Sequence, residues 1–335
     1  MGTKSVRSLF FLLDGVRSVA ATMQKASQNP PLWLYGAHAI VALPIQLALY
    51  GCVRVVSAIN TPLAVKAKTR YGSEMICCLP DGIQTCIFLY GVWEPDISAF
   101  IASELHPGDT FIDVGAHVGY HSVLASRAVG CDGNVVALEA SPETFAVLEN
   151  NLSLNPDCRN VRALNVAASE RTGMIPFYLG PKGLGIEGWS TTVLRDSFRQ
   201  RCTVSAGPLS SLLTEKELQT AKIIKIDVEG AEAEVLRGLV PSLGLLRQDV
   251  QLVIELSPSL WPAASREQNM TCEQVLSPLL DAGFRPYHIK NNYAPWRFLY
   301  PERISRPVQI RGPIRVSSVT GQIDLVLSKK DADRL

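Results

Sequence analysis

The sequence lacks an excess of charge of either sign, since its 335 residues include 32 Lys and Arg against 31 Asp and Glu. Surfaces that bind nucleic acid usually carry a basic excess, so the composition argues against a nucleic-acid partner. The sequence also lacks C-x-x-C pairs and Cys/His clusters with zinc spacing, and no set of residues specifies a metal. We expect the eight cysteines to be free thiols in a reducing compartment, because a chain of this length needs no disulfides.

Charged residues are also missing between Lys25 and Arg54, and residues 32–53 are mostly apolar. As a helix, this stretch would be about 33 Å long, which is enough to cross the core of a bilayer. Three interpretations stay open: a membrane-spanning helix, an interfacial helix, and a helix packed on the rest of the protein. Basic residues follow the stretch and favour a cytosolic location for what comes after it. We expect a cytoplasmic protein, with anchoring through 32–53 as one alternative.

Three regions follow from the patterning of the chain. Residues 1–70 form an apolar, helical N-terminal extension, and residues 71–104 form a lead-in to the core. In the lead-in, two strand-like patches around Pro80-Asp81-Gly82 predict a hairpin over 76–89, and a helix is predicted over 96–105. The third region, 105–330, is expected to be the catalytic domain.

Strand-like and helix-like segments alternate through this third region. The predicted core strands are 110–114, 134–138, 161–166, 222–226 and 250–255. The predicted helices between them are 121–129, 142–154 and 231–239. Such alternation is typical of an α/β fold with a parallel, doubly wound sheet. Edge strands are predicted at 285–289 and 323–327, and the glycine-rich stretch 180–203 is predicted to be a long loop.

A glycine turn follows the first core strand and is the strongest local feature. The residues at 113–120 are DVGAHVGY, which places Asp113 near the strand end and Gly115 and Gly119 before a helix. The glycines allow a sharp turn and a close approach of backbone to a ligand. The helix N-terminus then offers free N–H groups to an anion. The dinucleotide pattern G-x-G-x-x-G is absent, which argues against a nicotinamide dehydrogenase.

Two further acids lie at strand ends of the same domain. Glu139 closes the second core strand, where an acid can accept hydrogen bonds from a ribose. Asp227 closes the fourth core strand within IIKIDVEGAE at 223–232, at the end where open α/β sheets bind ligands. We expect Asp113, Gly115, Glu139 and Asp227 to meet at one edge of the sheet.

These motifs resemble those of the FkbM family of S-adenosylmethionine (SAM)-dependent methyltransferases. The resemblance covers about residues 91–327 and rests on four motifs: YGVWEP at 90–95, DVGAHVGY at 113–120, EASP at 139–142 and IKIDVEGAE at 224–232. His117 departs from the pattern, because the family usually has Asn there. The first 70 or so residues lie outside the resemblance.

The resemblance implies a class I methyltransferase fold, a Rossmann-like doubly wound sheet that binds SAM. Gly115 and Gly119 would face the methionine end of SAM, with Asp113 near its amino group. Glu139 would hold the ribose, and Val166 and Ala167 would flank the adenine, as the resemblance implies. Asp227 would border both the cofactor and the methyl acceptor.

The resemblance also implies O-methylation of a hydroxyl on a sugar or other small natural product. A base that removes the hydroxyl proton assists such a transfer, and Asp227 and Glu255 are the first choices among Asp227, Glu229, Glu255 and His121. The alternatives are an N-methyltransferase acting on another acceptor and a membrane-associated protein that binds SAM without turnover. The sequence specifies no oligomeric state.

Overall fold

The computed structural model describes residues 63–79, 81–180, 190–195, 198–263, 265, 269–291, 293, 298, 306–317 and 321–330. The apolar stretch 32–53 lies outside these residues, so its three interpretations stay predictions. Among the residues described, no helix has both the length and the apolarity that crossing a membrane requires. The described residues fall into two compact units. The first holds residues up to Ala99 with Asn291, Tyr293 and Phe298, and the second holds the rest.

The first unit contains a hairpin that differs from the predicted one. Strand β1 (Leu63–Lys68) pairs antiparallel with β2 (Glu74–Leu79), and α3 (Gly82–Tyr90) follows. The hairpin predicted over 76–89 is therefore wrong, because its second half is a helix. The cause is Asp81, whose side chain accepts a hydrogen bond from the backbone N–H of Gln84 at 2.8 Å and so caps the helix. The helix predicted for 96–105 is confirmed as α4 (Pro95–Glu104).

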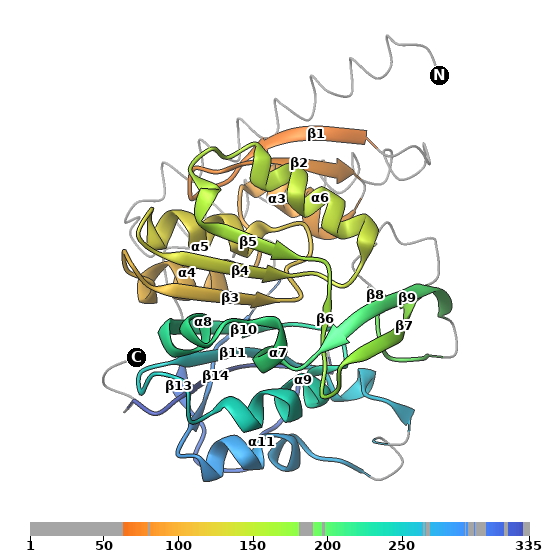
Figure 1. Ribbon diagram of the computed structural model, residues 1–335, viewed down its shortest axis with the longest axis vertical. Helices are drawn as coiled ribbons and strands as arrows, with labels where there is room; N and C mark the ends of the chain where they lie inside the picture. The colour runs from red at the N-terminus through yellow and green to blue at the C-terminus, as the bar shows by residue number, and fades with distance from the viewer. Residues whose placement is uncertain are drawn as a thin grey trace, which may run out of the picture. The chain divides into compact units, whose positions relative to one another are not determined.

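The second unit is built on a mixed sheet whose centre is parallel (Figure 1). Its spatial order is β13 (Val308–Gln309), β12 (Arg285–His288), β14 (Ile323–Ser328), β11 (Gln251–Leu256), β10 (Ala221–Ile226), β3 (Thr110–Val114), β4 (Asn134–Leu138) and β5 (Val161–Leu164). The pairs from β11 to β5 are parallel, and β14 is antiparallel to β11 and to β12. The five predicted core strands are confirmed. The two predicted edge strands exist, but β14 lies inside the sheet, and β13 forms the edge beyond β12.

The order of these strands creates one position where a ligand is expected. The chain runs outward from β3 to β4 and β5, then returns to β10 on the other side of β3 and continues to β11. The loops after β3 and β10 therefore leave the sheet in opposite directions. Open α/β sheets bind their ligands outside the carboxyl ends of the strands at such a reversal.

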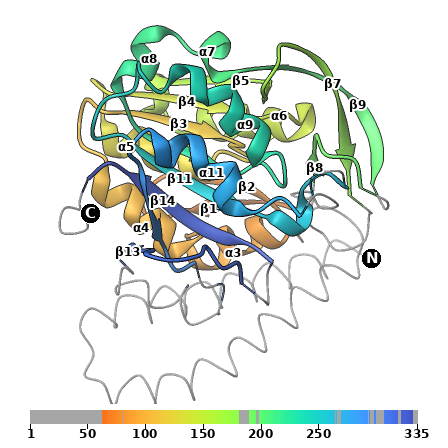
Figure 2. The ribbon, with the colours of Figure 1, turned by 90° about the horizontal axis from the view of Figure 1, so that it is seen from below.

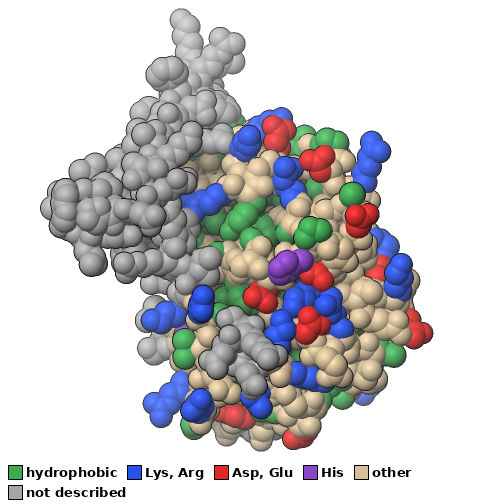
Figure 3. All heavy atoms as spheres, turned by 90° about the vertical axis from the view of Figure 1, so that its left-hand side faces the viewer, with side chains coloured by type: hydrophobic (Ala, Val, Ile, Leu, Met, Phe, Trp, Pro, Cys, Tyr) green, Lys and Arg blue, Asp and Glu red, His purple; other side chains and the backbone are tan. Residues whose placement is uncertain are grey.

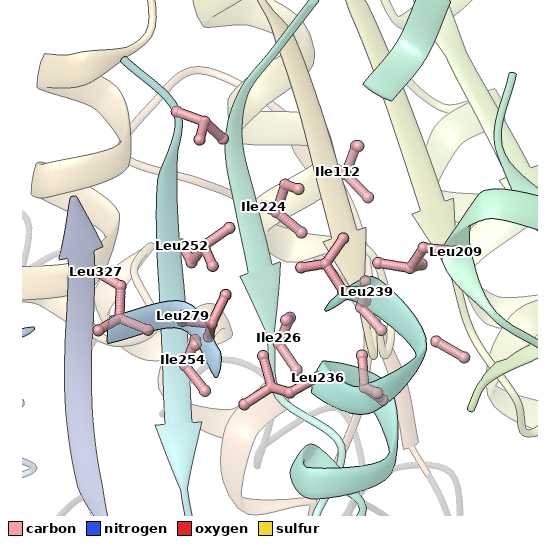
Figure 4. Packing of buried hydrophobic residues seen from close by; sticks show 14 of the residues in the cluster. Ile112, Leu209, Ile224, Ile226, Leu236, Leu239, Leu252, Ile254, Leu279 and Leu327 are labelled. Atoms are coloured by element: carbon pink, nitrogen blue, oxygen red, sulfur yellow. The ribbon is translucent and has the colours of Figure 1, made fainter. Parts of the chain in front are cut away.

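Apolar side chains on one face of the sheet pack against four helices. These are α7 (Leu209–Leu212), α8 (Glu215–Thr220), α9 (Glu232–Leu239) and α11 (Cys272–Asp281). Figure 4 shows Leu236 and Leu239 of α9 and Leu279 of α11 facing Ile224, Ile226 and Ile254 of the strands. The buried leucines and isoleucines of this layer are almost fully removed from water, which is the main force that holds helices on a sheet.

The other face of the sheet is covered by α5 (Tyr120–Val129) and α6 (Pro142–Ser153). Along β4, Val136 and Leu138 join the first apolar layer, while Ala137 packs with Leu148 of α6. This alternation is the period of two that a strand buried on both faces requires. The helices predicted for 121–129, 142–154 and 231–239 are confirmed with shifts of one residue. Short 3₁₀ turns lie at η1 (Cys158–Asn160), η2 (Val240–Ser242) and η3 (Pro258–Leu260).

A second sheet in the same unit was not predicted. Its order is β6 (Ala167–Ala168), β9 (Arg199–Gly207), β7 (Gly173–Leu179) and β8 (Ser190–Thr191). Figures 1 and 2 both show β7 and β9 as a ribbon that extends away from the main sheet. The loop predicted over 180–203 is therefore wrong at its C-terminal end, because residues from 199 pair with β7. Strand β9 is mostly polar and carries no apolar run, whereas β7 has the apolar sequence GMIPFYL, which the prediction missed.

The packing of the main sheet makes a quantitative prediction about stability. Ile224 in β10 is fully buried, whereas Val308 in β13 is 66% exposed. We expect Ile224→Ala to lower the free energy of unfolding by about 2–5 kcal/mol, because it removes buried methyl groups and leaves a cavity. Val308→Ala, the matched control, should change it by less than about 0.5 kcal/mol. Urea titration of both variants measures the difference, and equal effects would contradict the assigned core.

Candidate functional site

Backbone hydrogen bonds tie together three loops at the carboxyl edge of the main sheet. The N–H groups of Gly115 and Ala116 both donate to the carbonyl of Leu138 at 2.9 Å, which joins the loop after β3 to the end of β4. The N–H of Asp227 donates to the carbonyl of Val114 at 3.0 Å, which joins the loop after β10 to the end of β3. Backbone hydrogen bonds therefore hold these three loops together, as predicted.

Gly115 and Gly119 have positions that only glycine fills without strain. Their φ angles are +85° and +87°, in the left-handed region. A Cβ at Gly115 would overlap the carbonyl of Asp227, and a Cβ at Gly119 would overlap the side chain of Leu148. Both glycines thus permit close packing of one part of the chain on another. Their expected role beside a ligand stays a prediction.

His117 occupies the glycine turn with a φ of +51°. Its backbone N–H donates to Oε2 of Glu139 at 2.8 Å, so the turn and the end of β4 are also joined through a side chain. Asn and His are both enriched among non-glycine residues in the left-handed region. This shared tolerance explains how His117 replaces the Asn that the family usually has.

Asp113 is almost completely buried, with 1% of its surface exposed. The hydroxyl of Ser122 donates to its Oδ2 at 2.6 Å, while its Oδ1 has no hydrogen-bond partner among the described residues. Burial raises the pKa of Asp113, and the ammonium of Lys225 and the bond from Ser122 oppose that rise. A buried carboxylate oxygen without a partner is costly, so Oδ1 is a position where a donor is expected.

Glu139 bridges two of the loops. Its Oε1 accepts from the backbone N–H of Ser141 at 2.8 Å, and its Oε2 accepts from that of His117. Burial raises the pKa of this carboxyl, and the contacts with His117 and Ser141 oppose the rise. Each carboxylate oxygen has a second lone pair, so Glu139 retains the capacity to accept hydrogen bonds from a ligand.

A buried lysine lies beneath the site and was not singled out from the sequence. Lys225 is 4% exposed, and its Nζ donates to Oδ2 of Asp227 at 2.7 Å. Its charge also acts on Asp113, which is its register partner on β3. Burial, followed by the charge of Lys225, holds the pKa of His121 well below its usual value, so that ring is neutral. The signal in the sequence was a lysine inside an apolar strand, which is rare unless the charge is paired.

Two more acids follow β10, Glu229 in the loop and Glu232 at the first position of α9. Glu232 is 1% exposed and accepts from the backbone N–H of Gly230 at 2.6 Å and from Nε1 of Trp261 at 3.1 Å. Burial raises its pKa to about 7. Glu229 has a φ of +53°, and its carbonyl accepts hydrogen bonds from Thr191 at 2.9 Å and from the guanidinium of Arg195. Nothing local in the sequence links residues 191 and 195 to this loop.

The remaining predicted site residues are placed as follows. Val166 is buried in the main core, and Ala167 is buried in a smaller cluster with Phe177 of the second sheet. Glu255 lies on β11 beside β10, and its Oε1 accepts from Ser257 at 3.3 Å. The structure thus brings Asp113, Gly115, Glu139 and Asp227 to one edge, with Glu255 on the neighbouring strand. Their roles toward a cofactor stay predictions.

The order of the strands and the acids at this edge define a class I methyltransferase fold. The parallel strands reverse their order between β3 and β10, and antiparallel β14 lies beside β11. The chain belongs to the FkbM methyltransferase family. The family's methyltransferase FkbM domain matches residues 113–286. The motif at 90–95 lies outside the matched residues.

Two relatives show how far the similarity extends. The chain is 30% identical over 161 residues to the hexuronic acid methyltransferase AglP of Haloferax volcanii, which covers 48% of this chain and 61% of that protein. It is 29% identical over 163 residues to the methyltransferase sdnD of Sordaria araneosa, which covers 40% of this chain and 61% of that protein. The matches therefore span about three fifths of each relative.

Solved structures resemble the chain only distantly. A methyltransferase FkbM from Methylobacillus flagellatus aligns over 73% of this chain and 53% of its own with 12% identity and a TM-score of 0.38. A SAM-dependent O-methyltransferase from Thermotoga maritima aligns over 80% of this chain and 78% of its own with 15% identity and a TM-score of 0.37.

The packing role of Gly115 can be separated from its backbone conformation. Gly108 has a similar φ of +91°, but a Cβ there would meet nothing within 4 Å. We expect Gly108→Ala to lower the free energy of unfolding by about 1–2 kcal/mol through left-handed strain alone. Gly115→Ala adds an overlap with the Asp227 carbonyl and should cost at least about 3 kcal/mol. Chemical denaturation of both variants tests this, and equal costs would refute the tight contact between the two loops.

The raised pKa of Glu232 predicts how stability depends on pH. A carboxyl whose pKa is higher in the folded state stabilises the fold fully below its unfolded pKa, and this contribution is lost as the pH rises. For Glu232 the loss runs from about pH 4.5 through about pH 7 and amounts to about 3 kcal/mol.

Wild type should therefore lose unfolding free energy between pH 5 and pH 8, and Glu232→Gln should lose less. Glu234→Gln, which changes a neighbouring acid on α9, is the matched control and should keep the wild-type dependence. Urea titrations at several pH values provide the measurement. Identical pH dependence in wild type and Glu232→Gln would contradict the prediction.

Proposed function

We propose that this protein binds SAM at the carboxyl edge of β3, β4 and β10 and transfers its methyl group to a hydroxyl of a sugar or other small natural product. The observation that carries the proposal is the convergence of Asp113, Glu139 and Asp227 at the strand reversal, on loops tied by backbone hydrogen bonds. Family membership supports the same reaction class.

The groups at this edge fit the chemistry of SAM. Oδ1 of Asp113 has no hydrogen-bond partner among the described residues, so it can accept a hydrogen bond from the amino group of SAM. No side chain caps the N-terminus of α5, so its first N–H groups suit a carboxylate. Glu139 keeps lone pairs that suit ribose hydroxyls. We assign Val166 and Ala167 to the adenine end, as the order of the loops suggests.

When bound, SAM supplies a methyl group made electrophilic by its sulfonium. The residues of this chain would hold the acceptor in line with that group and exclude water. Lys225 fixes the carboxylate of Asp227 through its 2.7 Å hydrogen bond, and Asp227 would then border the acceptor. Glu255, on the neighbouring strand, is a second acid within the proposed acceptor region.

The proposed acceptor is a small hydroxyl compound, and a sugar is the first class to test. The name of the relative AglP describes a hexuronic acid methyltransferase, which supports a sugar acid as the first probe. On the face drawn in Figure 3, basic and acidic side chains intermingle and form no patch of one sign. The balance of 32 Lys and Arg against 31 Asp and Glu in the whole chain favours a small acceptor over nucleic acid. We also propose that the protein lies in the cytoplasm, with residues 32–53 as a candidate site of attachment to a membrane.

The cofactor assignment predicts the effect of two substitutions. Asp113→Ala and Glu139→Ala should each weaken SAM binding roughly 10- to 100-fold, because each removes a partner of a buried polar group. Asp157→Ala, at an exposed acid paired with Arg127, is the control and should bind like wild type. Calorimetry with SAM, and with NAD as the competing cofactor, measures this. Wild-type SAM affinity in both site variants would refute the assignment.

The acceptor is tested with SAM carrying a labelled methyl group and the methyl glycosides of glucuronic acid, galacturonic acid and glucose. Label that survives mild alkali in a sugar product indicates an O-methyl ether and supports the proposal. Label released by alkali indicates a methyl ester on the sugar acid, and label on nitrogen indicates an N-methyltransferase. SAM binding without transfer to any compound, including those in a cell extract, would favour a non-catalytic protein.

A further inference from the structure

Two of the three acids within residues 227–232 form contacts within the protein. Asp227 holds the ammonium of Lys225 at 2.7 Å through Oδ2. Glu232 is enclosed, and its two oxygens accept from the N–H of Gly230 and from the indole of Trp261. Both oxygens of Glu232 are therefore occupied, and one of the two oxygens of Asp227 is held by the charge of Lys225. The third acid, Glu229, lies between them in the sequence and has a different environment.

The carboxyl oxygens of Glu229 form no hydrogen bond with any residue that the structure describes. Its side chain is half-buried, so the carboxyl is neither enclosed like that of Glu232 nor fully solvated. It lies two residues after Asp227, on the loop that leaves β10 at the strand reversal. Glu229 is thus the acid of this loop whose functional group the fold leaves available.

The backbone of Glu229, in contrast, is firmly held. Its φ of +53° lies in the left-handed region, which is unusual for a residue with a Cβ. Its carbonyl accepts two hydrogen bonds, one from the hydroxyl of Thr191 and one from the guanidinium of Arg195, which also stacks over the ring of Phe198. Strained backbone that its surroundings hold in place is concentrated at functional sites. Both hydrogen bonds go to the main chain, so neither occupies a carboxyl oxygen of Glu229.

We propose that Glu229 is the base that takes the proton from the acceptor hydroxyl during methyl transfer. This inference rests on the proposed function. The acceptor oxygen forms its bond to the methyl carbon while the carbon–sulfur bond breaks and its electron pair stays on sulfur. The hydroxyl proton passes to the carboxylate of Glu229, which later releases it to solvent. Thr191 and Arg195 are positioning residues, because they act through the backbone of Glu229.

The electrostatic surroundings of Glu229 suit this role. Burial, together with the neighbouring carboxylates of Asp227 and Glu232, raises its pKa to about 8, although the charges of Arg195 and Lys225 oppose the rise. A base works best when its pKa lies near the working pH, since it is then both ionised in part and strong enough to take the proton. Of the acids first chosen from the sequence, Asp227 has one oxygen on Lys225, and Glu255 accepts from Ser257.

The experiment compares Glu229→Gln with the control Glu234→Gln, at an acid on α9 outside the site. We expect Glu229→Gln to bind SAM within about threefold of wild type but to lose methyl transfer by roughly 100-fold or more. Wild-type kcat should rise with pH to a plateau above about pH 8, and the variant should lack that rise. Glu234→Gln should behave like wild type in all three measurements. Transfer by Glu229→Gln within threefold of wild type, with the same pH profile, would overturn the inference.

A second measurement requires no acceptor. In protein labelled with ¹³C at the glutamate carboxyl groups, one signal should titrate near pH 8 and disappear in Glu229→Gln. If the Glu229 signal titrates near pH 4.5 in the SAM-bound protein, the inference fails even though SAM binding supports the proposed function. Absence of SAM binding by wild type would instead overturn the proposed function itself and this inference with it.

Discussion

Asp113, Asp227 and Glu229 lie near one buried ammonium, that of Lys225, at the carboxyl edge of the main sheet. Carboxylates crowded in a partly dry site repel one another and tend to take up protons. Lys225 offsets that repulsion, and its register opposite Asp113 sets where the positive charge lies. Burial and the same charge hold the pKa of His121 low, which favours a carboxylate over His121 as the proposed base. The chemistry proposed for the site therefore depends on a lysine that need not touch a ligand.

The backbone around this charge cluster is unusually constrained. Left-handed residues occur in both loops that meet at the strand reversal, at Gly115 and His117 in one and at Glu229 in the other. Gly115 lets the two loops touch, and hydrogen bonds from Gly115, Ala116 and Asp227 join them to β3 and β4. Thr191 and Arg195 extend the constraint to the segment before β9. A site held in this way can keep acids at short separations, because the main chain cannot relax to move them apart.

Sequence patterns predicted the parallel core well, and local chemistry explains both the successes and the failures. The short apolar runs of β3, β4 and β10 are typical of strands in a sheet that is covered on both faces. The Asp81-Gly82 pair was misinterpreted as a hairpin turn, because the same residue types are favoured in turns and at helix N-caps. The ribbon of β7 and β9 was missed because β9 is mostly polar, and its small buried cluster with Phe177 of β7 forms only when the two strands pair.

By itself, the sequence determined the family, the parallel sheet, and the acids that close its strands, since apolar periodicity and glycine turns act over a few residues. Only the tertiary structure decided which acid is available. Asp227 and Glu229 are two positions apart and look equivalent in the motif, yet Lys225 binds an oxygen of the first carboxylate, whereas Thr191 and Arg195 form their hydrogen bonds with the backbone carbonyl of the second residue. That difference arises from contacts that the strand pairing and the fold of distant segments bring together, and no local pattern encodes such contacts.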